Sequence, residues 1–410
     1  MEPGAGTSPS ETWATVGAER GVGLLAIQLW LLELPFLRPL ATARGTHSRR
    51  PLVLVQVIGD HSGTLVEGWG ECAALADTTF DAENATRSLA LLQHALVPGL
   101  TDLAPVVGSP LPAPSDLGPI RSAAPDAPLA YAALEMAVAD THLRAAGVSL
   151  AARLGRQGSL VPIGTVVGRP GTVDDLVTQV GGIVDAGYAR VKVKIGPGWD
   201  VTPLGALRAE FPRLVLQADA NGSYGREDID HLTALDPLEL LCLEQPLEPS
   251  DLEGHTRLGE RLRTPICLDE SLSSARSVHQ AVAMGACSAV CVKPGRLGGI
   301  GAALDVIGWC AETGIPAWIG GMFESGFARG VNTVLAALPG VAWPGDLSPA
   351  SGYLGTDLVP EPQLVMEPLG TGDPVLWARP PDDAGMGPTP DPAMLERSVQ
   401  RRVWIELPRR

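Results

Sequence analysis

The stretch ARVKVKI, residues 189–195, is a short apolar run interrupted by charged side chains, and four similar runs follow it along the chain. They are RLVLQAD (213–219), ELLCLEQP (239–246), TPICLDE (264–270) and SAVCVKP (288–294). Short apolar runs separated by amphipathic stretches are typical of the parallel strands of βα units. With VPIGTVV (161–167) before them, IPAWIGG (315–321) after them and an eighth candidate in VAWPGD (341–346), the runs predict a (β/α)8-type barrel. An open doubly wound sheet is the competing architecture.

A charged side chain stands near the end of each of these five runs, at a nearly constant interval. Starting from Lys194, the series continues with Asp219, Glu244, Asp269 and Lys293, at intervals of 25, 25, 25 and 24 residues. One βα unit takes roughly this length, so all five groups are expected at the mouth of the barrel where such enzymes keep their active sites. Lys192 is two residues before Lys194 and shares its face of the strand. In an eight-stranded barrel the second and sixth strands lie opposite each other, so Lys293 should face this lysine pair.

Three carboxylates that converge at a barrel mouth repel one another unless a cation neutralises them. The expected metal ligands are Asp219, Glu244 and Asp269, and hard oxygen ligands suit Mg²⁺ or Mn²⁺. A carboxylate substrate bound to such an ion becomes a stronger carbon acid, because the metal stabilises the enediolate that forms. Asn221 and Glu270 follow two of these carboxylates closely, and they are either supporting partners of the metal ligands or ordinary loop residues.

The lysines are few enough to be informative. The chain has 30 basic residues, and since only Lys192, Lys194 and Lys293 are lysine, the other 27 are arginine. Arginine is never deprotonated in proteins, whereas an amine can lose its proton and act as a base. Crowding by one another and by the metal is expected to lower the pKa of these amines toward working pH. Either Lys194 or Lys293 could then take the proton next to the substrate carboxylate or return it. The alternative is that all three are leftover surface lysines.

Two glycine-containing runs carry weaker signals. The run PGRLGGIGAAL (294–304) lacks the spacing of phosphate-binding loops, so it predicts a tight βα turn, with phosphate binding as the alternative. In GGMFESG (320–326), glycines let backbone N–H groups approach a ligand closely, and polar side chains follow. We expect this run to hold a substrate carboxylate through Gly320, Gly321, Met322, Glu324 and Ser325. The seven histidines form no HExxH pair and give little support to a zinc site.

The rest of the chain predicts a second structural unit. Strand-like and then helical patterns make 21–155 an expected α+β domain beside the barrel at 156–355. The apolar run 21–37 is interrupted by polar residues and is predicted to be a first strand rather than a membrane span or a signal peptide. Residues 1–20 are expected to be a disordered tail. Residues 356–410 are expected to pack toward the first domain, and from about residue 379 a disordered tail is the alternative.

Bulk composition excludes several classes of partner. A net charge of −16 argues against nucleic acid and anionic membrane surfaces, because both require a basic face. With 45% hydrophobic residues, most of the 410-residue chain can form a core. The six cysteines lie mostly in apolar runs without a CxxC pair, which predicts reduced, buried thiols of a cytoplasmic protein. The expected partner is a small carboxylate substrate.

Residues from about 22 to 360 resemble the enolase superfamily, in its muconate-lactonizing subgroup. The motifs that carry the resemblance are KVK at 192–194, Asp219 with Asn221, LEQPL with Glu244, DES at 269–271 and KPG at 293–295. The resemblance implies a (β/α)7β barrel closed by an α+β capping domain, which the N-terminal third and the end of the chain form together. Enolase-superfamily sites use a lysine or histidine base with Mg²⁺. The segments 38–50 and 76–82 are then expected to be loops over the substrate.

Within this subgroup, GGMFESG resembles the corresponding segment of the o-succinylbenzoate synthases and of the related N-succinylamino acid racemases. The first group implies a lyase of menaquinone synthesis that dehydrates 2-succinyl-6-hydroxy-2,4-cyclohexadiene-1-carboxylate to 2-succinylbenzoate. By this resemblance Lys194 removes the proton and then assists departure of hydroxide, Lys293 stabilises the enediolate, and Lys192 tunes Lys194. A racemase would instead exchange protons through both Lys194 and Lys293. Another cycloisomerase and an idle barrel that only binds are the remaining alternatives.

Overall fold

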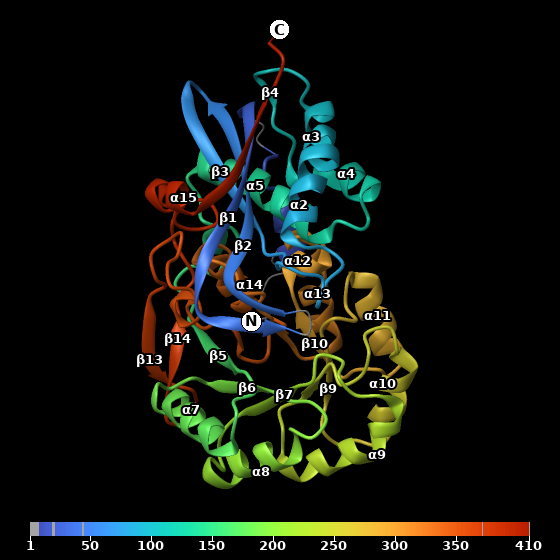
Figure 1. Cartoon of the computed structure of the whole chain (residues 1–410). Helices are drawn as coiled ribbons and strands as arrows, with labels where there is room; N and C mark the ends of the chain where they lie inside the picture. The colour runs from blue at the N-terminus through green and yellow to red at the C-terminus, as the bar shows by residue number, and fades with distance from the viewer. Residues whose placement is uncertain (1–7, 19–20, 43–44, 371, 410) are drawn as a thin grey trace, which may run out of the picture.

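The computed structural model of the chain describes residues 8–18, 21–42, 45–370 and 372–409. These residues form two sheets, one in each half of the molecule, and helices pack against both (Figure 1). The strands of the N-terminal third and the last strand of the chain build the upper sheet, and the middle of the chain builds the lower one. We propose the boundary between a capping unit, residues 21–155, and a barrel unit, residues 156–355, on this division.

The lower sheet is a barrel of eight parallel strands. In chain order they are β5 Val161–Val167, β6 Arg190–Lys194, β7 Leu216–Asp219, β8 Leu243–Glu244, β9 Ile266–Leu268, β10 Ala289–Val292, β11 Ala317–Ile319 and β12 Gly345–Asp346. Strands β5 to β11 are neighbours in sequence order, and β12 pairs with β5. The segment before β12 also bonds β11, because the N–H groups of Ala342 and Trp343 donate to the Ala317 carbonyl. The sheet therefore closes on itself, which confirms the predicted barrel; the open doubly wound alternative is wrong.

Helices follow the strands and cover the outside of the barrel (Figure 1). They are α7 Val173–Asp185, α8 Val201–Glu210, α9 Ile229–Leu232, α10 Leu252–Gly259, α11 Ala275–Ala283, α13 Ile300–Thr313 and α14 Gly326–Ala336. Shorter turns between them are η3 Arg226–Asp228, η4 Thr233–Leu238, α12 Pro294–Leu297 and η5 Ala350–Gly352. Each long helix buries one face; in α7, for example, Leu176 and Val180 lie four residues apart and are both buried.

The upper sheet has the strand order β15-β1-β2-β3, and a short strand β4 also pairs with β1. Its strands are β1 Val22–Thr42, β2 Gly45–His61, β3 Thr64–Cys72, β4 Ser109–Pro110 and β15 Val399–Glu406. The long helix α5 Pro128–Ala146 packs against β3, and a Cβ atom on Gly70 would lie 1.9 Å from the Ala133 carbonyl oxygen. Only glycine permits this close approach of helix and sheet. The remaining helices are α2 Ala85–Leu91, η1 Leu92–Leu96, α3 Val97–Leu103, η2 Pro114–Leu117, α4 Gly118–Ala123 and α6 Leu150–Arg153.

The C-terminal segment divides between the two halves. The hairpin of β13 Leu364–Pro368 and β14 Pro374–Ala378 extends the barrel sheet, because β14 pairs antiparallel with β5. After α15 Pro392–Ser398, strand β15 returns to the upper sheet and pairs antiparallel with β1. The segment is thus not a tail, and only its last part packs on the capping unit as expected. Strands need partners for their backbone groups: β15 pairs with β1, and β14 pairs with the start of β5 at Val161 and Pro162, before the residues that pair with β12.

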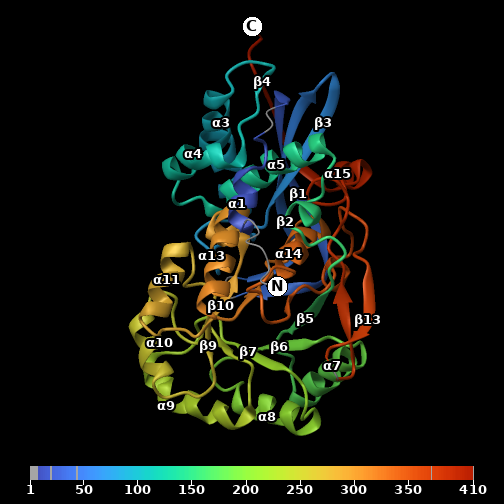
Figure 2. The ribbon, with the colours of Figure 1, turned by 180° about the vertical axis from the view of Figure 1, so that it is seen from behind.

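The N-terminal residues differ from the expected disordered tail. Residues 9–14 form helix α1 Pro9–Ala14, which begins with a capping box between Ser8 and Glu11. Trp13 is 5% exposed and Val16 is 2% exposed, so this short segment buries an aromatic side chain in the main core. Figure 2 shows α1 beside α13 of the barrel. The residues around Trp13 are mostly polar, so the sequence did not indicate this buried contact. Residues 1–7 and 19–20 lie outside the described residues.

The segment 38–50 also differs from the expected loop. It is the end of a β-hairpin, because β1 runs to Thr42 and β2 starts at Gly45 (Figure 1). Residues 43–44, at the turn, lie outside the described residues. Arginine-rich sequence predicted a loop here, but backbone pairing with the neighbouring strand continues to the turn. Of the segment 21–37, residues 22–37 lie in β1, as predicted.

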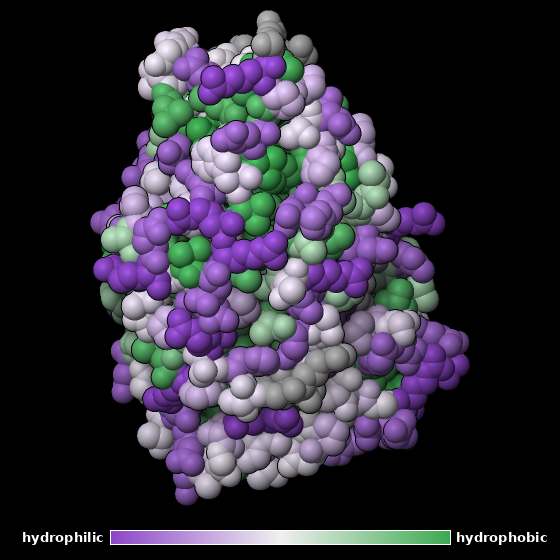
Figure 3. Space-filling model, turned by 45° about the horizontal axis from the view of Figure 1, so that its top comes forward, coloured by the Kyte–Doolittle hydropathy of each residue, from purple (hydrophilic) through white to green (hydrophobic). Residues whose placement is uncertain are grey.

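The outer surface is mostly polar. On the face seen in Figure 3, hydrophilic residues predominate and apolar ones emerge in separate patches. The exposed large apolar side chains of the capping sheet and its helices include Leu65, Leu103 and Trp404. None of the helices within the described ranges is both long enough and apolar enough to cross a lipid bilayer. All six cysteines are buried free thiols, as their apolar surroundings predicted.

Candidate active site

Neighbouring barrel strands bring the predicted charged groups together. Lys194 and Asp219 are paired residues in the register of β6 and β7, and Asp219 and Glu244 are paired in β7 and β8. Asp269 directly follows β9, and Lys293 directly follows β10. Because adjacent parallel strands keep equivalent residues at the same level, the constant sequence interval becomes a ring of side chains at one mouth of the barrel.

Each lysine contacts at least one of the carboxylates. Lys194 Nζ donates to Asp219 Oδ2 at 2.7 Å and to Asn221 Oδ1 at 2.6 Å. Lys293 Nζ donates to Asp269 Oδ2 at 2.7 Å. Lys293 follows β10, which is four strands from β6, the strand of Lys194. Four of eight strands is half the circumference, so the two amines stand on opposite walls. Their side chains differ in access: that of Lys194 is 32% exposed, and that of Lys293 is 12% exposed.

Lys192 lies beneath this layer as the centre of a buried ion cluster. Its Nζ is 2.7 Å from Asp346 Oδ2, 3.0 Å from Glu244 Oε2 and 3.3 Å from Asp219 Oδ2. Arg190 donates to the other oxygen of Asp346 at 2.8 Å. The ammonium group of Lys192, in β6, thus contacts carboxylates of β7, β8 and the closing strand β12. A charge this deeply buried is tolerated only with such partners.

The charges in the site shift one another's pKa values in opposite directions. Burial, and then repulsion by Asp219, raises the pKa of Glu244 to about 8. Burial also acts to raise the pKa of Asp219, but attraction to the lysines outweighs it and holds that pKa below its usual range. Arg296 and Lys293 lower the pKa of Asp269 against the same effect of burial. Such opposed shifts among adjacent groups are common at catalytic sites.

The protein groups around Lys192 and Lys293 shift the pKa values of these two amines upward, opposite to the lowering expected from the metal and the other lysines. Burial acts to lower the pKa of Lys293, but attraction to Asp269 outweighs it, and the pKa lies above its ordinary value. For Lys192, burial is likewise outweighed, first by Asp346 and then by Glu244. The nearest groups to each of these amines are carboxylates, which favour the charged form. The expected lowering depended also on the charge of a bound cation, so it stays a prediction.

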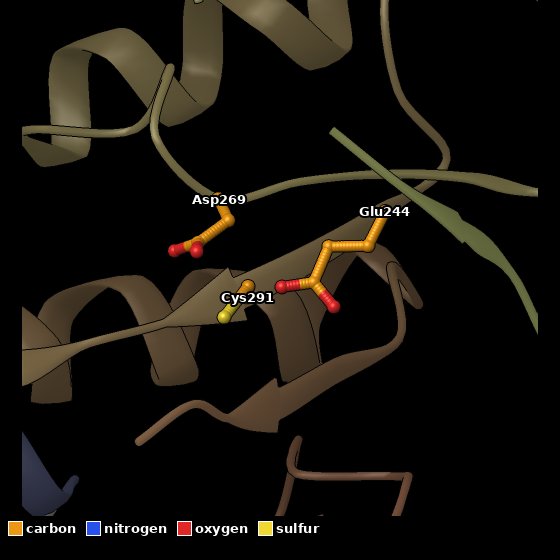
Figure 4. A group of neighbouring side chains, drawn as sticks. All are labelled: Glu244, Asp269 and Cys291. Atoms are coloured by element: carbon orange, nitrogen blue, oxygen red, sulfur yellow. The ribbon is translucent and has the colours of Figure 1, made fainter. Parts of the chain in front are cut away.

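The acidic groups fit a divalent cation by their chemistry. Glu244 and Asp269 place carboxylate oxygens within 4.8 Å of each other and of the Cys291 thiol, all pointing into the same space (Figure 4). Asp219 stands beside Glu244 in the next strand. Glu270 Oε2 is buried without a hydrogen-bond partner among the described residues, which is costly unless something else satisfies it. An all-oxygen donor set of this kind suits Mg²⁺ or Mn²⁺.

Asn221 and Glu270 support the ring of charges. The Asn221 N–H donates to Asp219 Oδ1 at 3.0 Å, and its side-chain amide donates to Glu270 Oε1 at 2.8 Å. Asn221 adopts a φ of 45°, a left-handed conformation that asparagine tolerates better than most residues. These contacts link Lys194, Asp219 and Glu270 into one network, so the structure places both residues next to the site.

The segment GGMFESG is only partly directed toward the lysines. Lys293, Met322 and Glu324 line a cavity of about 30 Å³ together with Glu71 of the capping sheet. Glu324 is already engaged, since it accepts a hydrogen bond from the Met322 N–H at 2.8 Å. Ser325 caps α14 and donates its hydroxyl hydrogen to Glu71. Because Glu324 and Ser325 have protein partners, substrate binding by this segment stays a prediction that rests most on Gly321 and Met322.

Gly320 has a packing reason for its small size. A Cβ atom there would lie 2.5 Å from Cys291 Sγ and 2.8 Å from Lys293 Cε. The absence of a side chain on Gly320, directly after β11, therefore leaves the room that Lys293 occupies. The backbone N–H of Gly320 donates to the Val292 carbonyl oxygen at 3.0 Å as part of strand pairing, so this N–H is not free for a ligand.

Sequence reasoning missed two charged residues of the site. Asp346 ends the eighth strand, and its strand-end position was the available signal. Arg296, within PGRLGG, donates to Asp269 and, through Nε, to Asp81 Oδ1 at 2.8 Å. Asp81 belongs to the predicted loop 76–82, so one guanidinium joins a candidate metal ligand to the capping unit. No local pattern distinguishes such an arginine from a solvent-exposed one.

The alternative that residues 294–304 bind phosphate is wrong, because a carboxylate already occupies the backbone N–H groups that would bind it. The carboxylate of Glu135 in α5 accepts hydrogen bonds from the Ile300 and Gly301 N–H groups at 2.6 and 3.3 Å. These are the first N–H groups of α13, where a phosphate would bind. The tight turn expected there is formed by Gly298 and Gly299, both with positive φ.

Known proteins are similar to this chain in sequence and in fold. Residues 175–394 match a family model described as "Enolase C-terminal domain-like". An N-succinylamino acid racemase from an Amycolatopsis species is 39% identical over 386 residues, which cover 93% of this chain and 99% of the relative. An o-succinylbenzoate synthase from Geobacillus stearothermophilus is 37% identical over 369 residues, or 90% and 94% of the two chains. A solved enolase-superfamily structure from Listeria innocua has a TM-score of 0.85 at 31% identity, covering 94% of this chain and 100% of that one.

Proposed function

The chain belongs to the enolase superfamily, in its muconate-lactonizing subgroup, and from this premise we propose that it is an o-succinylbenzoate synthase. The reaction would be the dehydration of 2-succinyl-6-hydroxy-2,4-cyclohexadiene-1-carboxylate to 2-succinylbenzoate and water, a step of menaquinone synthesis. The observation that carries the proposal is the unequal access of the two site lysines. Lys194 is the more exposed amine, as expected when a single base serves a reaction on one face of the substrate.

Lys194 would perform both proton transfers. As a free amine, its Nζ takes the proton from the ring carbon that bears the carboxylate, and the electron pair is left on the substrate as an enediolate. The carbon–oxygen bond to the ring hydroxyl then breaks, and Lys194 returns the proton to the departing oxygen, which leaves as water. Proton removal and water loss occur on the same face, so one amine is sufficient. Asn221 Oδ1 and Asp219 Oδ2 would orient Nζ between the two transfers.

The carboxylates Asp219, Glu244 and Asp269 would hold Mg²⁺ or Mn²⁺. A bound divalent cation would make the substrate a stronger carbon acid by withdrawing charge from its carboxylate. Lys293, on the opposite wall, would place its ammonium group near the developing negative charge. Lys192 would keep the three carboxylates from repelling one another, because its Nζ contacts two of them directly.

Racemisation of N-succinylamino acids is the second candidate function. It is favoured by the relative that is 39% identical and by the position of Lys194 and Lys293 on opposite walls. A proton removed from one face and returned on the other requires two such amines. The same residues would serve both reactions, so the substrate determines which one is observed.

Incubation of the purified chain and Mg²⁺ with the cyclohexadiene substrate tests the proposal. Proton NMR should show the aromatic signals of 2-succinylbenzoate, and EDTA should abolish their appearance. A parallel incubation with an N-succinylamino acid in deuterated water tests the second candidate through exchange of the α-proton. Exchange without any aromatic product would overturn the synthase proposal in favour of the racemase.

A further inference from the structure

Three cysteines lie directly beneath the proposed catalytic layer. Cys242 precedes Glu244 by two residues, Cys267 precedes Asp269 by two, and Cys291 precedes Lys293 by two. Side chains two apart on a strand share a face, so each thiol points into the barrel one level below a charged group. The three cysteines pack with Ala289 and Trp318 in a small cluster of fully or almost fully buried residues.

Cys291 differs from the other two in its surroundings. Cys267 accepts a hydrogen bond from Trp318 Nε1 at 3.2 Å and lies 3.7 Å from the Leu268 carbonyl oxygen. Cys291 has no hydrogen-bond partner in the part of the chain that the structure describes, and it is 2% exposed. Its Sγ instead shares a space with carboxylate oxygens of Glu244 and Asp269, all within 4.8 Å of one another (Figure 4).

We propose that Cys291, Glu244 and Asp269 form a binding site for a thiophilic divalent cation such as Zn²⁺ or Cd²⁺. Glu244 lies in β8, Asp269 directly follows β9 and Cys291 lies in β10. These strands are neighbours and the three ligands are buried, so little ordering is needed to bring them together. Thiolate and carboxylate together suit zinc-like ions, whereas Mg²⁺ and Mn²⁺ prefer oxygen. As the sulfur–metal bond forms, the thiol proton is released to solvent.

This site overlaps the proposed magnesium site without coinciding with it. Two carboxylates are shared, but Asp219, the third proposed ligand of Mg²⁺, is not in the group that surrounds the thiol. A thiophilic ion would therefore sit deeper in the barrel and farther from Lys194. Because both ions need Glu244 and Asp269, binding of one excludes the other, and Zn²⁺ or Cd²⁺ would act as a competitor of the hard cation.

Titration of the metal-free, full-length chain with Cd²⁺ tests the inference. Ultraviolet difference absorption should show a sulfur-to-cadmium charge-transfer band that saturates at one equivalent, and added Mg²⁺ should weaken the apparent affinity. Cys291→Ser should lose the band and bind Cd²⁺ more weakly, because a serine oxygen is a poorer ligand than a thiolate for a thiophilic ion. Cys310→Ser is the matched control, because Cys310 is a buried thiol of α13, and it should keep the band.

A band that persists in Cys291→Ser, or its absence from the unmodified chain, would overturn the inference. The ¹¹³Cd NMR shift of the unmodified chain gives a check that needs no variant, since sulfur ligation moves the resonance strongly downfield; a shift typical of oxygen ligands alone would also overturn it. The inference rests on the proposed function only through the two shared carboxylates. Mg²⁺-dependent dehydration without a cadmium band would refute this site alone, and a cadmium band without dehydration would refute only the proposed activity.

Discussion

Replacing Lys192 by methionine should destabilise the protein more than any exposed charge deletion. The substitution keeps most of the side-chain volume but removes the ammonium that lies within 3.3 Å of Asp219, Glu244 and Asp346. Removing one partner of a buried ion cluster typically costs about 3–5 kcal/mol, because the remaining charge is left uncompensated.

The contacts of the three carboxylates place the expected loss near the lower end of that range. Asp219 keeps Lys194 at 2.7 Å, and Asp346 keeps Arg190 at 2.8 Å. Glu244, whose pKa burial already raises to about 8, can take up a proton instead of remaining charged. We therefore expect Lys192→Met to lower the free energy of unfolding by about 3 kcal/mol.

Equilibrium unfolding in urea at pH 7, without added metal and followed by tryptophan fluorescence, measures this loss. The matched control is Arg213→Met, which deletes an ion pair with Asp373 whose side chains are 88% and 78% exposed. Exposed pairs contribute about 0–1 kcal/mol, so the control should unfold close to the unmodified chain. A Lys192→Met protein within about 1 kcal/mol of the unmodified chain would refute the buried-cluster reasoning.

Three further predictions concern Glu135, which contacts the barrel from the capping unit, Gly320, which follows β11, and removal of the metal. Burial raises the pKa of Glu135 from its ordinary value of 4.5 to about 7, so protonation of this carboxyl group favours the folded state. The stability that this group contributes is fully present below pH 4.5 and is lost as pH rises through 7. Urea unfolding at pH 5, 6 and 7 should show the unmodified chain losing up to about 1 kcal/mol per pH unit relative to Glu135→Gln, and parallel pH profiles would contradict this. Gly320→Ala should destabilise the fold by about 1–3 kcal/mol and slow turnover, because the new methyl group displaces Cys291 and Lys293; unchanged stability and rate would show that the strand yields freely. Chelation by EDTA should lower the unfolding free energy by about 2.7 kcal/mol relative to Mg²⁺ at 100 times its Kd, and identical urea midpoints would contradict a cation site.

The barrel and its ring of charges were predictable because they follow from a repeat. Each strand occupies the same place in its βα unit, so Asp219, Glu244 and Asp269 had to meet if the sheet closed. The same logic extends to Asp346, which ends the predicted eighth run VAWPGD, but the seventh run IPAWIGG ends in glycines and interrupts the series of charged groups.

Contacts between distant segments were not predictable in this way. Arg296 and Asp81 lie 215 positions apart, and Arg50 reaches across to the carbonyl groups of Met322 and Phe323. Arginines with such partners look the same in sequence as arginines on the surface. The burial of Trp13 against the barrel likewise depends on where the chain returns, which no local periodicity encodes.

The lysine chemistry shows a third kind of limit. Position in the barrel was correct for all three lysines, but the sequence did not show that carboxylates would raise the pKa values of Lys192 and Lys293. Charge balance depends on which groups come within about 3 Å, and the carboxylates of Asp269 and Asp346 come closest. Spacing along the chain fixes the layer of each group but not its nearest neighbour.

The dehydration rate of Lys194→Arg at saturating Mg²⁺ tests the central claim most directly. Arginine keeps the positive charge beside Asp219 but cannot release a proton at working pH, so it separates charge from base chemistry. Loss of a positioned proton-transfer group is expected to slow the reaction by about 10²–10⁴-fold while metal binding and folding are retained. A folded, metal-binding Lys194→Arg protein that forms 2-succinylbenzoate at the unmodified rate would contradict the account.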